Sequence, residues 1–314
     1  MTNAVPSLSG ETVLVTGASG FIGGALCRRL ARDGAEVHAV SRGAADLPPG
    51  VRAQRTDLAD SDEVRRIFRE LKPGIVFHLA GHVQGSRALE QVLPALAGNL
   101  LTTVNMLHAA VESGCERILL TGSQDEPDPG EASATDFVPP SPYAAAKLAG
   151  SAYARMFREL YACPVSIARI FMGYGPGQRD LAKLLPYTIL CFLRGEAPRI
   201  GSGARPMDRV YVDDVVDGLL RTAKAPAAVG RVVDLGTGEL HTGREAVEKI
   251  AGHMAPRVPA EFGAVADRKH ERARCANVQS TVSLLGWRPE VGFDEGLRRT
   301  IAWYRERFES GVFR

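Results

Sequence analysis

The stretch ETVLVTGASGFIGGALCRRLARDG, Glu11–Gly34, places an apolar run directly before a glycine-rich turn and an amphipathic pattern. The run Thr12–Thr16 is typical of a strand that is buried on both faces. Gly17, Gly20 and Gly23 follow it with GxxGxxG spacing, and apolar residues then recur at helical intervals. The stretch therefore predicts a strand, a tight turn and a helix in immediate succession.

A strand, turn and helix in this order are typical of a site for the pyrophosphate of a dinucleotide. The chain must turn tightly at Gly17, while the missing side chain of Gly20 lets the backbone approach a phosphate. Gly23 lets the helix pack closely on the strand, and the helix N-terminus attracts phosphate charge. A merely flexible turn would explain the glycines but not the order of the elements. The other expected cofactor contacts in this turn are Ser19, Phe21 and Ile22.

The end of the second predicted strand bears on which dinucleotide is bound. Ser41 and Arg42 stand where an NAD-binding chain would have an acidic residue for the adenosine ribose. A guanidinium can pair with a 2′-phosphate and a serine can add a hydrogen bond, so NADP(H) is favoured and NAD(H) is the alternative. A solvated strand-end arginine would also explain Arg42. Asp57 and Leu58, after the third strand, are expected near the adenine.

Short apolar runs alternate with longer amphipathic stretches, which predicts a parallel sheet covered by helices on both faces. The predicted strands are Thr12–Thr16, Glu36–Ser41, Ile75–Ala80, Arg117–Thr121, Val165–Ile170 and Arg231–Leu235. The predicted helices are Gly23–Arg32, Ser61–Leu71, Leu96–Ser113, Pro142–Tyr161 and, after a glycine-rich segment, Leu181–Arg194. We expect an NAD(P)-binding domain of residues 1–171 plus 210–236, and a smaller, discontinuous α/β substrate lobe of residues 172–209 plus 237–314.

Composition excludes several classes of function. A formal net charge of +2 gives no basic surface for nucleic acid. The first ten residues lack a signal-peptide pattern, and no apolar run is long enough to cross a bilayer, so we expect a soluble cytoplasmic protein. The 5 cysteines are widely spaced, which indicates reduced thiols and no metal site.

A second group of residues carries catalytic chemistry. Ser141 and Pro142 predict a helix start, and Tyr143 and Lys147 then share one helical face. A phenol has a pKa near ~10, which a nearby ammonium and a cationic nicotinamide would lower. Tyr143 would then act as a general acid or base, and Ser123, just past a strand, would bind the same carbonyl oxygen. A Tyr–Lys pair at this spacing is common in helices. Here it indicates a catalytic site because a glycine turn typical of dinucleotide sites lies upstream.

Together these residues resemble the extended short-chain dehydrogenase/reductases, in particular the nucleotide-sugar epimerase/dehydratase group. The matching motifs are TGASGFIG at Thr16–Gly23, FHLAG at Phe77–Gly81, Ser123, YAAAK at Tyr143–Lys147, GPGQ at Gly175–Gln178, VYVDDVVDGL at Val210–Leu219 and LGWRP at Leu285–Pro289. The stretches LKPGIVFHLAG, TGSQDE and YGPGQ look closest to GDP-4-keto-6-deoxymannose reductases and GDP-mannose 4,6-dehydratases.

The resemblance implies a Rossmann-like, doubly wound sheet with a C-terminal substrate lobe. It implies a homodimer built through a four-helix bundle, here from Leu96–Ser113 and Pro142–Tyr161. By match, Lys147 would also hold the nicotinamide ribose, and Asn99 would lie near the substrate. The additional cofactor positions that it implies are Leu79, Ala80 and Gly81.

The chain departs from the family pattern at two substrate positions. Met172 replaces a common asparagine, and Met207-Asp208-Arg209 replaces a common Arg-Asp-Phe. The arginine expected at the substrate diphosphate is therefore displaced to Arg205 or Arg209, with Arg268 as a further candidate. Each of the three would also be an ordinary surface charge.

The motifs leave the reaction open. Reduction of a 4-keto(-6-deoxy) nucleotide sugar, with Tyr143 as the proton donor, ranks first because Arg42 favours an exchanging NADPH. Epimerisation and 4,6-dehydration follow closely. Asp125, two residues after Ser123, is a candidate acid/base for dehydration, but the similar reductases also have an acidic residue there, so it does not decide the reaction. A non-catalytic NADP sensor would not need Ser123, Tyr143 and Lys147 together. A reductase of carbonyl compounds without a nucleotide would use the two methionines as an apolar pocket.

Overall fold

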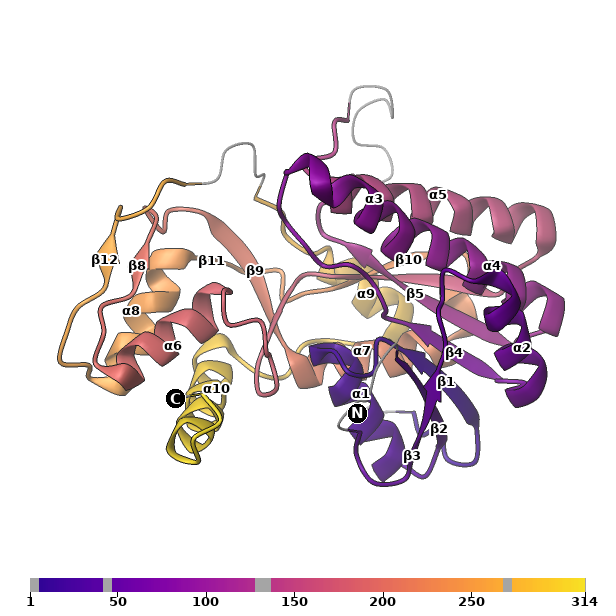
Figure 1. Ribbon diagram of the computed structural model, residues 1–314, viewed down its shortest axis with the longest axis horizontal. Helices are drawn as coiled ribbons and strands as arrows, with labels where there is room; N and C mark the ends of the chain where they lie inside the picture. The colour runs from indigo at the N-terminus through magenta and orange to yellow at the C-terminus, as the bar shows by residue number, and fades with distance from the viewer. Residues whose placement is uncertain (1–5, 42–46, 128–136, 268–272, 314) are drawn as a thin grey trace. The chain divides into compact units, whose positions relative to one another are not determined.

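The computed structural model describes residues 6–41, 47–127, 137–267 and 273–313 (Figure 1). The chain divides into two compact units. The first consists of Met1–Ile170, Val216–Leu235 and Gln279–Trp287, and the second of Phe171–Val215, Gly236–Val278 and Arg288–Arg314.

The first unit contains a 7-stranded sheet whose strands are all parallel to their neighbours. The strands are β1 (Thr12–Thr16), β2 (Glu36–Ser41), β3 (Val51–Arg55), β4 (Ile75–His78), β5 (Arg117–Ser123), β6 (Val165–Ile170) and β10 (Val232–Leu235). Their order is β10-β6-β5-β4-β1-β2-β3. The chain therefore winds outward in both directions from the β1–β4 pair, which is the doubly wound Rossmann-like arrangement that the motifs predict.

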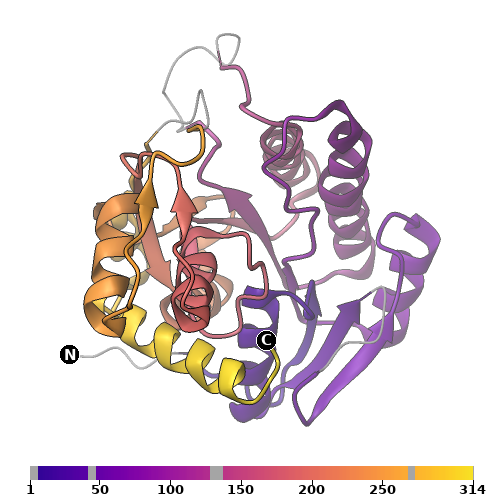
Figure 2. The same cartoon turned by 60° about the vertical axis from the view of Figure 1, so that its left-hand side comes forward.

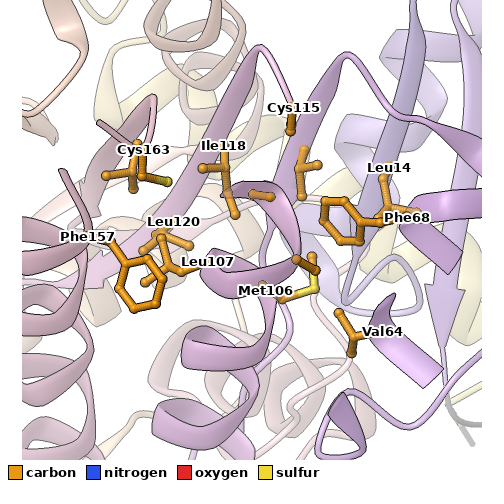
Figure 3. Packing of buried hydrophobic residues seen from close by; sticks show 14 of the residues in the cluster. Leu14, Val64, Phe68, Met106, Leu107, Cys115, Ile118, Leu120, Phe157 and Cys163 are labelled. Carbon is orange, nitrogen blue, oxygen red and sulfur yellow. The ribbon is translucent and has the colours of Figure 1, made fainter. Parts of the chain in front are cut away.

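Helices cover both faces of this sheet. The α-helices are α1 (Phe21–Arg32), α2 (Ser61–Leu71), α3 (Val92–Ala95), α4 (Thr102–Ser113) and α5 (Pro142–Tyr161). Two further helices belong to this unit in part: α7 (Val212–Lys224) from Val216 onward and α9 (Val278–Leu285) from Gln279 onward. Figure 3 shows the core beneath α2, α4 and α5, where Phe68, Met106, Leu107 and Phe157 meet Leu14 and Ile118 of the sheet. This apolar packing fixes α5 against β5 and β6.

The second unit is a smaller α/β structure. It has a three-stranded sheet of β7 (Met172–Tyr174), β9 (Pro206–Tyr211) and β11 (Leu240–Thr242), and a strand pair of β8 (Arg199–Ile200) and β12 (Glu261–Phe262). Its helices are α6 (Leu184–Arg194), α8 (Gly243–Met254) and α10 (Phe293–Glu309). Figure 2 shows these three helices packed side by side. Asp208 holds the unit together by accepting hydrogen bonds from the N–H groups of Thr237, Gly238 and Ala276.

Several predicted boundaries are confirmed. The strands Thr12–Thr16, Glu36–Ser41 and Val165–Ile170 and the helices Ser61–Leu71 and Pro142–Tyr161 begin and end as predicted. The predicted helix Leu96–Ser113 is wrong at its start, because helical structure begins earlier, with a 3₁₀ turn at Leu89–Gln91 followed by α3, and Leu96–Leu101 (η2) is π-helical. One side-chain contact accompanies the change: Asn99 Nδ2 donates to the carbonyl of Ala95 at 3.0 Å, where a main-chain N–H would otherwise bind.

Among the described helices, none is both long and apolar enough to cross a membrane.

The turn between β1 and α1 determines how closely the first helix packs on the sheet. Gly17 has φ +69°, and a Cβ built on it would lie 2.7 Å from the Ala80 nitrogen. A Cβ on Gly23 would lie 2.2 Å from the carbonyl oxygen of Gly17. Gly24, the next residue, has room for a side chain, since its nearest contact would be 3.4 Å away.

The two neighbouring glycines of α1 provide a matched test of this packing. We expect Gly23→Ala to lower the free energy of unfolding by at least about 2 kcal/mol, because backbone must move apart. Gly24→Ala should leave it unchanged or raise it by up to about 1 kcal/mol, as alanine favours helix. Urea unfolding of both variants measures the difference. Equal stabilities of the two variants would contradict the close packing at Gly23.

Candidate active site

The turn from β1 into α1 has the geometry of a phosphate-binding turn. Gly20 is the N-cap of α1, and because glycine has no side chain, no side-chain cap covers the first N–H groups of the helix. Such groups attract negative charge. Ser19 is exposed, and Phe21 and Ile22 are half-buried. The predicted cofactor residues of this turn therefore surround a helix N-terminus at the carboxyl end of β1.

The loop after β4 lies beside this turn. The N–H of Leu79 donates to the carbonyl of Thr16 at 3.3 Å, and that of Ala80 donates to the Thr16 hydroxyl oxygen at 3.1 Å. Since β1 and β4 are the strands at which the sheet order reverses, their carboxyl ends form the crevice where doubly wound sheets bind ligands. The structure thus brings Leu79, Ala80 and Gly81 next to the glycine turn.

The structure describes Ser41, Asp57 and Leu58 of the residues that are predicted to lie near adenosine. Ser41 ends β2 and is half-buried, whereas Arg42 lies outside the described residues. Asp57 is exposed, and its carboxylate accepts the N–H of Ala59 at 3.0 Å. Leu58 is buried, with its carbonyl bound by the amide of Asn105 at 2.9 Å.

The structure brings the predicted catalytic side chains together. Ser123, the last residue of β5, is buried, and Tyr143 and Lys147 lie one turn apart on α5. The Tyr143 hydroxyl shares a hydrogen bond with Ser123, and the Lys147 ammonium lies 5.9 Å from the centre of the Tyr143 ring. The helix begins as predicted, because the Ser141 hydroxyl accepts the N–H of Ala144 at 3.2 Å.

Lys147 is held by the strand that carries Ser123. Its ammonium donates to the carbonyl of Thr121 at 2.9 Å and to the Thr121 hydroxyl at 3.3 Å. Burial lowers the pKa of Lys147 to about 8, and the negative charge of Glu126 opposes that change. The ammonium therefore keeps a fixed place beside Tyr143.

The pKa of Tyr143 is raised, although the sequence predicts that the ammonium of Lys147 would lower it. Burial raises the pKa of the phenol, the charges of Glu126 and Asp125 raise it further, and the hydrogen bond with Ser123 lowers it. The groups of the chain itself thus favour a neutral phenol. A pKa near neutrality has to come from a cation that binds close to the ring, such as an oxidised nicotinamide.

Asn99 lies in the π-helical segment η2 and is fully buried. Its carbonyl oxygen accepts the N–H of His82 at 3.0 Å, and its amide donates to the carbonyls of His82 and Ala95. A Cβ on Gly81 would lie 2.6 Å from the same Asn99 oxygen. Asn99 therefore holds the loop at Gly81 and His82, and its polar atoms are already engaged.

The predicted diphosphate arginines belong to the second unit. Arg205 is half-buried, just before β9, and Arg209 is buried within β9. Arg209 donates to the carbonyl of His241 at 2.5 Å, and burial lowers its pKa to about 10, helped by the charge of Arg205. Met172 and Met207 are half-buried in β7 and β9. Arg268 lies outside the described residues.

Asp125 and Glu126 occupy different environments. Asp125 is half-buried, and its N–H donates to the Ser123 hydroxyl at 3.2 Å. Glu126 is buried, and its carboxylate accepts the N–H of Ser123 at 2.6 Å and the hydroxyl of Ser151 at 2.5 Å. Thr121 and Glu126 are the ends of the TGSQDE stretch, but neither was predicted as a site residue, because only the folded chain places them beside Lys147.

Within the described residues, no group of three or more His, Cys, Asp or Glu side chains could hold a metal ion. All five cysteines are free thiols, and only Cys275 is exposed.

Comparison with known proteins agrees with this geometry. The model of the NAD dependent epimerase/dehydratase family matches residues 13–236. A UDP-glucose 4-epimerase of Mycolicibacterium smegmatis is 33% identical, with 94% of this chain and 98% of that protein covered. The structure of a Thermus thermophilus UDP-glucose 4-epimerase in complex with NAD is 29% identical, with a TM-score of 0.82 and 94% and 99% of the chains covered.

A further solved structure, MoeE5 in complex with UDP-glucuronic acid and NAD, is 33% identical with a TM-score of 0.82, over 94% of this chain and 99% of that one. The family model covers more than half of the chain and includes both the glycine turn and the Ser123, Tyr143 and Lys147 site. The chain therefore belongs to the NAD dependent epimerase/dehydratase family of extended short-chain dehydrogenase/reductases, as its motifs predict.

Proposed function

We propose that the chain is a nucleotide-sugar 4-epimerase that keeps NAD(H) bound and acts on a UDP-hexose or UDP-hexuronate. The observation that supports this most is the assembled Ser123, Tyr143 and Lys147 site, in a chain aligned over nearly its whole length with a UDP-glucose 4-epimerase. The first unit would hold the cofactor, and the second would hold the sugar nucleotide.

The glycine turn fits a dinucleotide. Side chains are absent at Gly17, Gly20 and Gly23, and the α1 N-terminus offers N–H groups to a pyrophosphate. Lys147 would hold the nicotinamide ribose, as the family resemblance implies. When bound, NAD(H) supplies the acceptor and donor of hydride at carbon 4 of the sugar.

The chain itself handles the proton. Tyr143 would take the proton of the carbon-4 hydroxyl and later return it, with Ser123 hydrogen-bonded to the same oxygen. Because burial and the charges of Glu126 and Asp125 favour the neutral phenol, Tyr143 would act as a base only with a cation bound beside its ring. In the second unit, Arg205 and Arg209 are the candidates for the substrate diphosphate, since guanidinium groups pair well with phosphate oxygens. Arg209 is already bound to the carbonyl of His241, which favours Arg205.

Reduction of a 4-keto nucleotide sugar by NADPH is the second candidate. Burial and two neighbouring carboxylates raise the pKa of Tyr143, and a neutral phenol is suited to donating a proton. The Ser41-Arg42 pair favours a 2′-phosphate, and the GDP-sugar reductases share the TGSQDE and YGPGQ stretches. We rank this candidate second, because the similar proteins include UDP-glucose 4-epimerases and structures in complex with NAD. Asp125 remains available as an acid/base if the reaction includes dehydration.

The purified chain should interconvert UDP-glucose and UDP-galactose, or the matching uronates, without added cofactor, and should release NAD(H) when denatured. Tyr143→Phe removes the acid but keeps the ring, so turnover should fall by ~100- to 10,000-fold while cofactor content stays unchanged. Product analysis by NMR and assay of the released cofactor measure both effects.

Consumption of NADPH with a 4-keto sugar, together with no epimerisation, would replace the first candidate by the second. Near-normal turnover of Tyr143→Phe would refute the proposed role of Tyr143 in either case. Loss of cofactor in that variant would show that Tyr143 belongs to the cofactor site.

We also propose a homodimer through α3, η2 and α5. These segments lie side by side (Figure 1) and carry exposed apolar side chains. Leu93 of α3 is 74% exposed, Leu96 of η2 49% and Tyr153 of α5 42%. Clusters of exposed apolar residues mark protein–protein interfaces, and paired helices from two copies would cover these.

Light scattering should therefore give twice the chain mass. The double variant Leu93→Glu/Tyr153→Glu should shift the protein toward the monomer, because two charges would be buried at the interface. Leu240→Glu, at an exposed leucine of the second unit, is the matched control and should remain dimeric. A monomeric wild type at micromolar concentration would contradict the proposal.

A further inference from the structure

We propose that Glu126 is a positioning residue of this site, whose buried carboxylate fixes the main chain at Ser123 and provides the counter-charge of Lys147. The inference rests on the proposed catalytic roles of Ser123 and Lys147. Glu126 lies in the turn after β5, and its relative exposure is 7%. A carboxylate is rarely buried to this extent unless it is hydrogen-bonded or paired.

The carboxylate closes the turn that presents Ser123. One oxygen accepts the Ser123 N–H at 2.6 Å, and the Glu126 N–H donates back to the Ser123 carbonyl at 3.0 Å. A Cβ on Gly122 would lie 3.0 Å from the same carboxylate oxygen, so glycine leaves space for it. These two hydrogen bonds hold the Ser123 backbone from both sides.

The other oxygen connects this turn to α5. It accepts the hydroxyl of Ser151, which lies one turn after Lys147 on the same helical face. Lys147 in turn donates to Thr121 of β5. The strand carrying Ser123 and the helix carrying Tyr143 are thus linked twice, through Glu126 and through Lys147.

The charges around Lys147 make Glu126 its counter-charge. Among the residues that the structure describes, the charged groups that face this region are Glu126 from the turn, Asp125 beside Tyr143, and Arg169 of β6. Arg169 is paired with Asp234 at 2.7 and 3.0 Å, and it also donates to the main-chain carbonyl of Glu126 at 3.5 Å. His78 is buried with its pKa lowered to about 3, so it adds no charge near neutrality.

The same charge acts on both catalytic groups. It raises the pKa of Lys147 against the effect of burial, and it raises the pKa of Tyr143. Glu126 therefore favours the protonated form of each side chain. Because both of its oxygens accept hydrogen bonds from Ser123 and Ser151, Glu126 acts through these residues and not as the acid that meets the substrate.

The variant Glu126→Gln removes the negative charge at this position but keeps the size of the side chain and its capacity for both hydrogen bonds. Its amide oxygen can still accept the Ser123 N–H, and its NH₂ can donate to the Ser151 oxygen. The protein with ¹³C-labelled lysine gives six ε-methylene resonances, and Lys147→Met identifies that of Lys147. We expect the titration midpoint of Lys147 to fall by about one pH unit or more in Glu126→Gln, since a nearby negative charge is lost.

Two variants serve as matched controls. Asp125→Asn removes a charge one residue away and should leave the Lys147 midpoint in place. Ser151→Ala removes a hydrogen bond but keeps the charge, and should also leave it. If Glu126→Gln does not fold, Glu126→Ala must lower the midpoint in the same direction.

An unchanged or raised midpoint in the Glu126 variants would overturn the proposal, as would an equal fall in Asp125→Asn. The titration uses the protein alone, so its outcome is independent of whether the chain epimerises UDP-sugars. Where turnover is measurable, the alkaline limb of its pH profile should move down in Glu126→Gln by the same amount as the midpoint.

Discussion

The close contact between α1 and the end of β1 is the constraint on which the first unit depends. A Cβ on Gly23 would lie 2.2 Å from the carbonyl oxygen of Gly17, so helix and strand can approach only through glycine. This contact directs the α1 N-terminus toward the carboxyl end of the sheet. It also leaves the loop after β4 free to bind Thr16 through the N–H groups of Leu79 and Ala80. The geometry typical of a phosphate-binding turn, and the crevice beside it, both follow from that contact.

The side chains that we propose as catalytic depend on a second set of contacts, between β5 and α5. Apolar packing under α5 sets the distance between the two elements, and Lys147 and Glu126 connect them with buried polar bonds. Burial of these groups makes their charges effective, because a low local dielectric strengthens every interaction among them. The pKa of Lys147 falls to about 8, and that of Tyr143 rises, so the phenol needs a bound cation to act as a base near neutrality.

Local pattern was enough to predict much of the fold. The helix Pro142–Tyr161 follows from a capping serine, an N1 proline and apolar periodicity, all of which are readable within a few residues. The π-helical start of the segment before α4 could not be read in this way, since it accompanies a contact of Asn99 with Ala95. No role could be assigned to Glu126 from the sequence for the same reason: the role that we propose depends on its burial against Ser151, 25 residues away. The contact of Arg209 with His241 is likewise visible only in the folded chain.

We propose that this site removes the hydrogen from carbon 4 of a nucleotide sugar and returns it to the same carbon. A UDP-hexose labelled with deuterium at carbon 4 tests this directly, with the product examined by NMR and mass spectrometry. The expected product is an epimer that keeps the deuterium at carbon 4, with none exchanged into water. Deuterium lost to the solvent, or found at carbon 6 of the product, would contradict it.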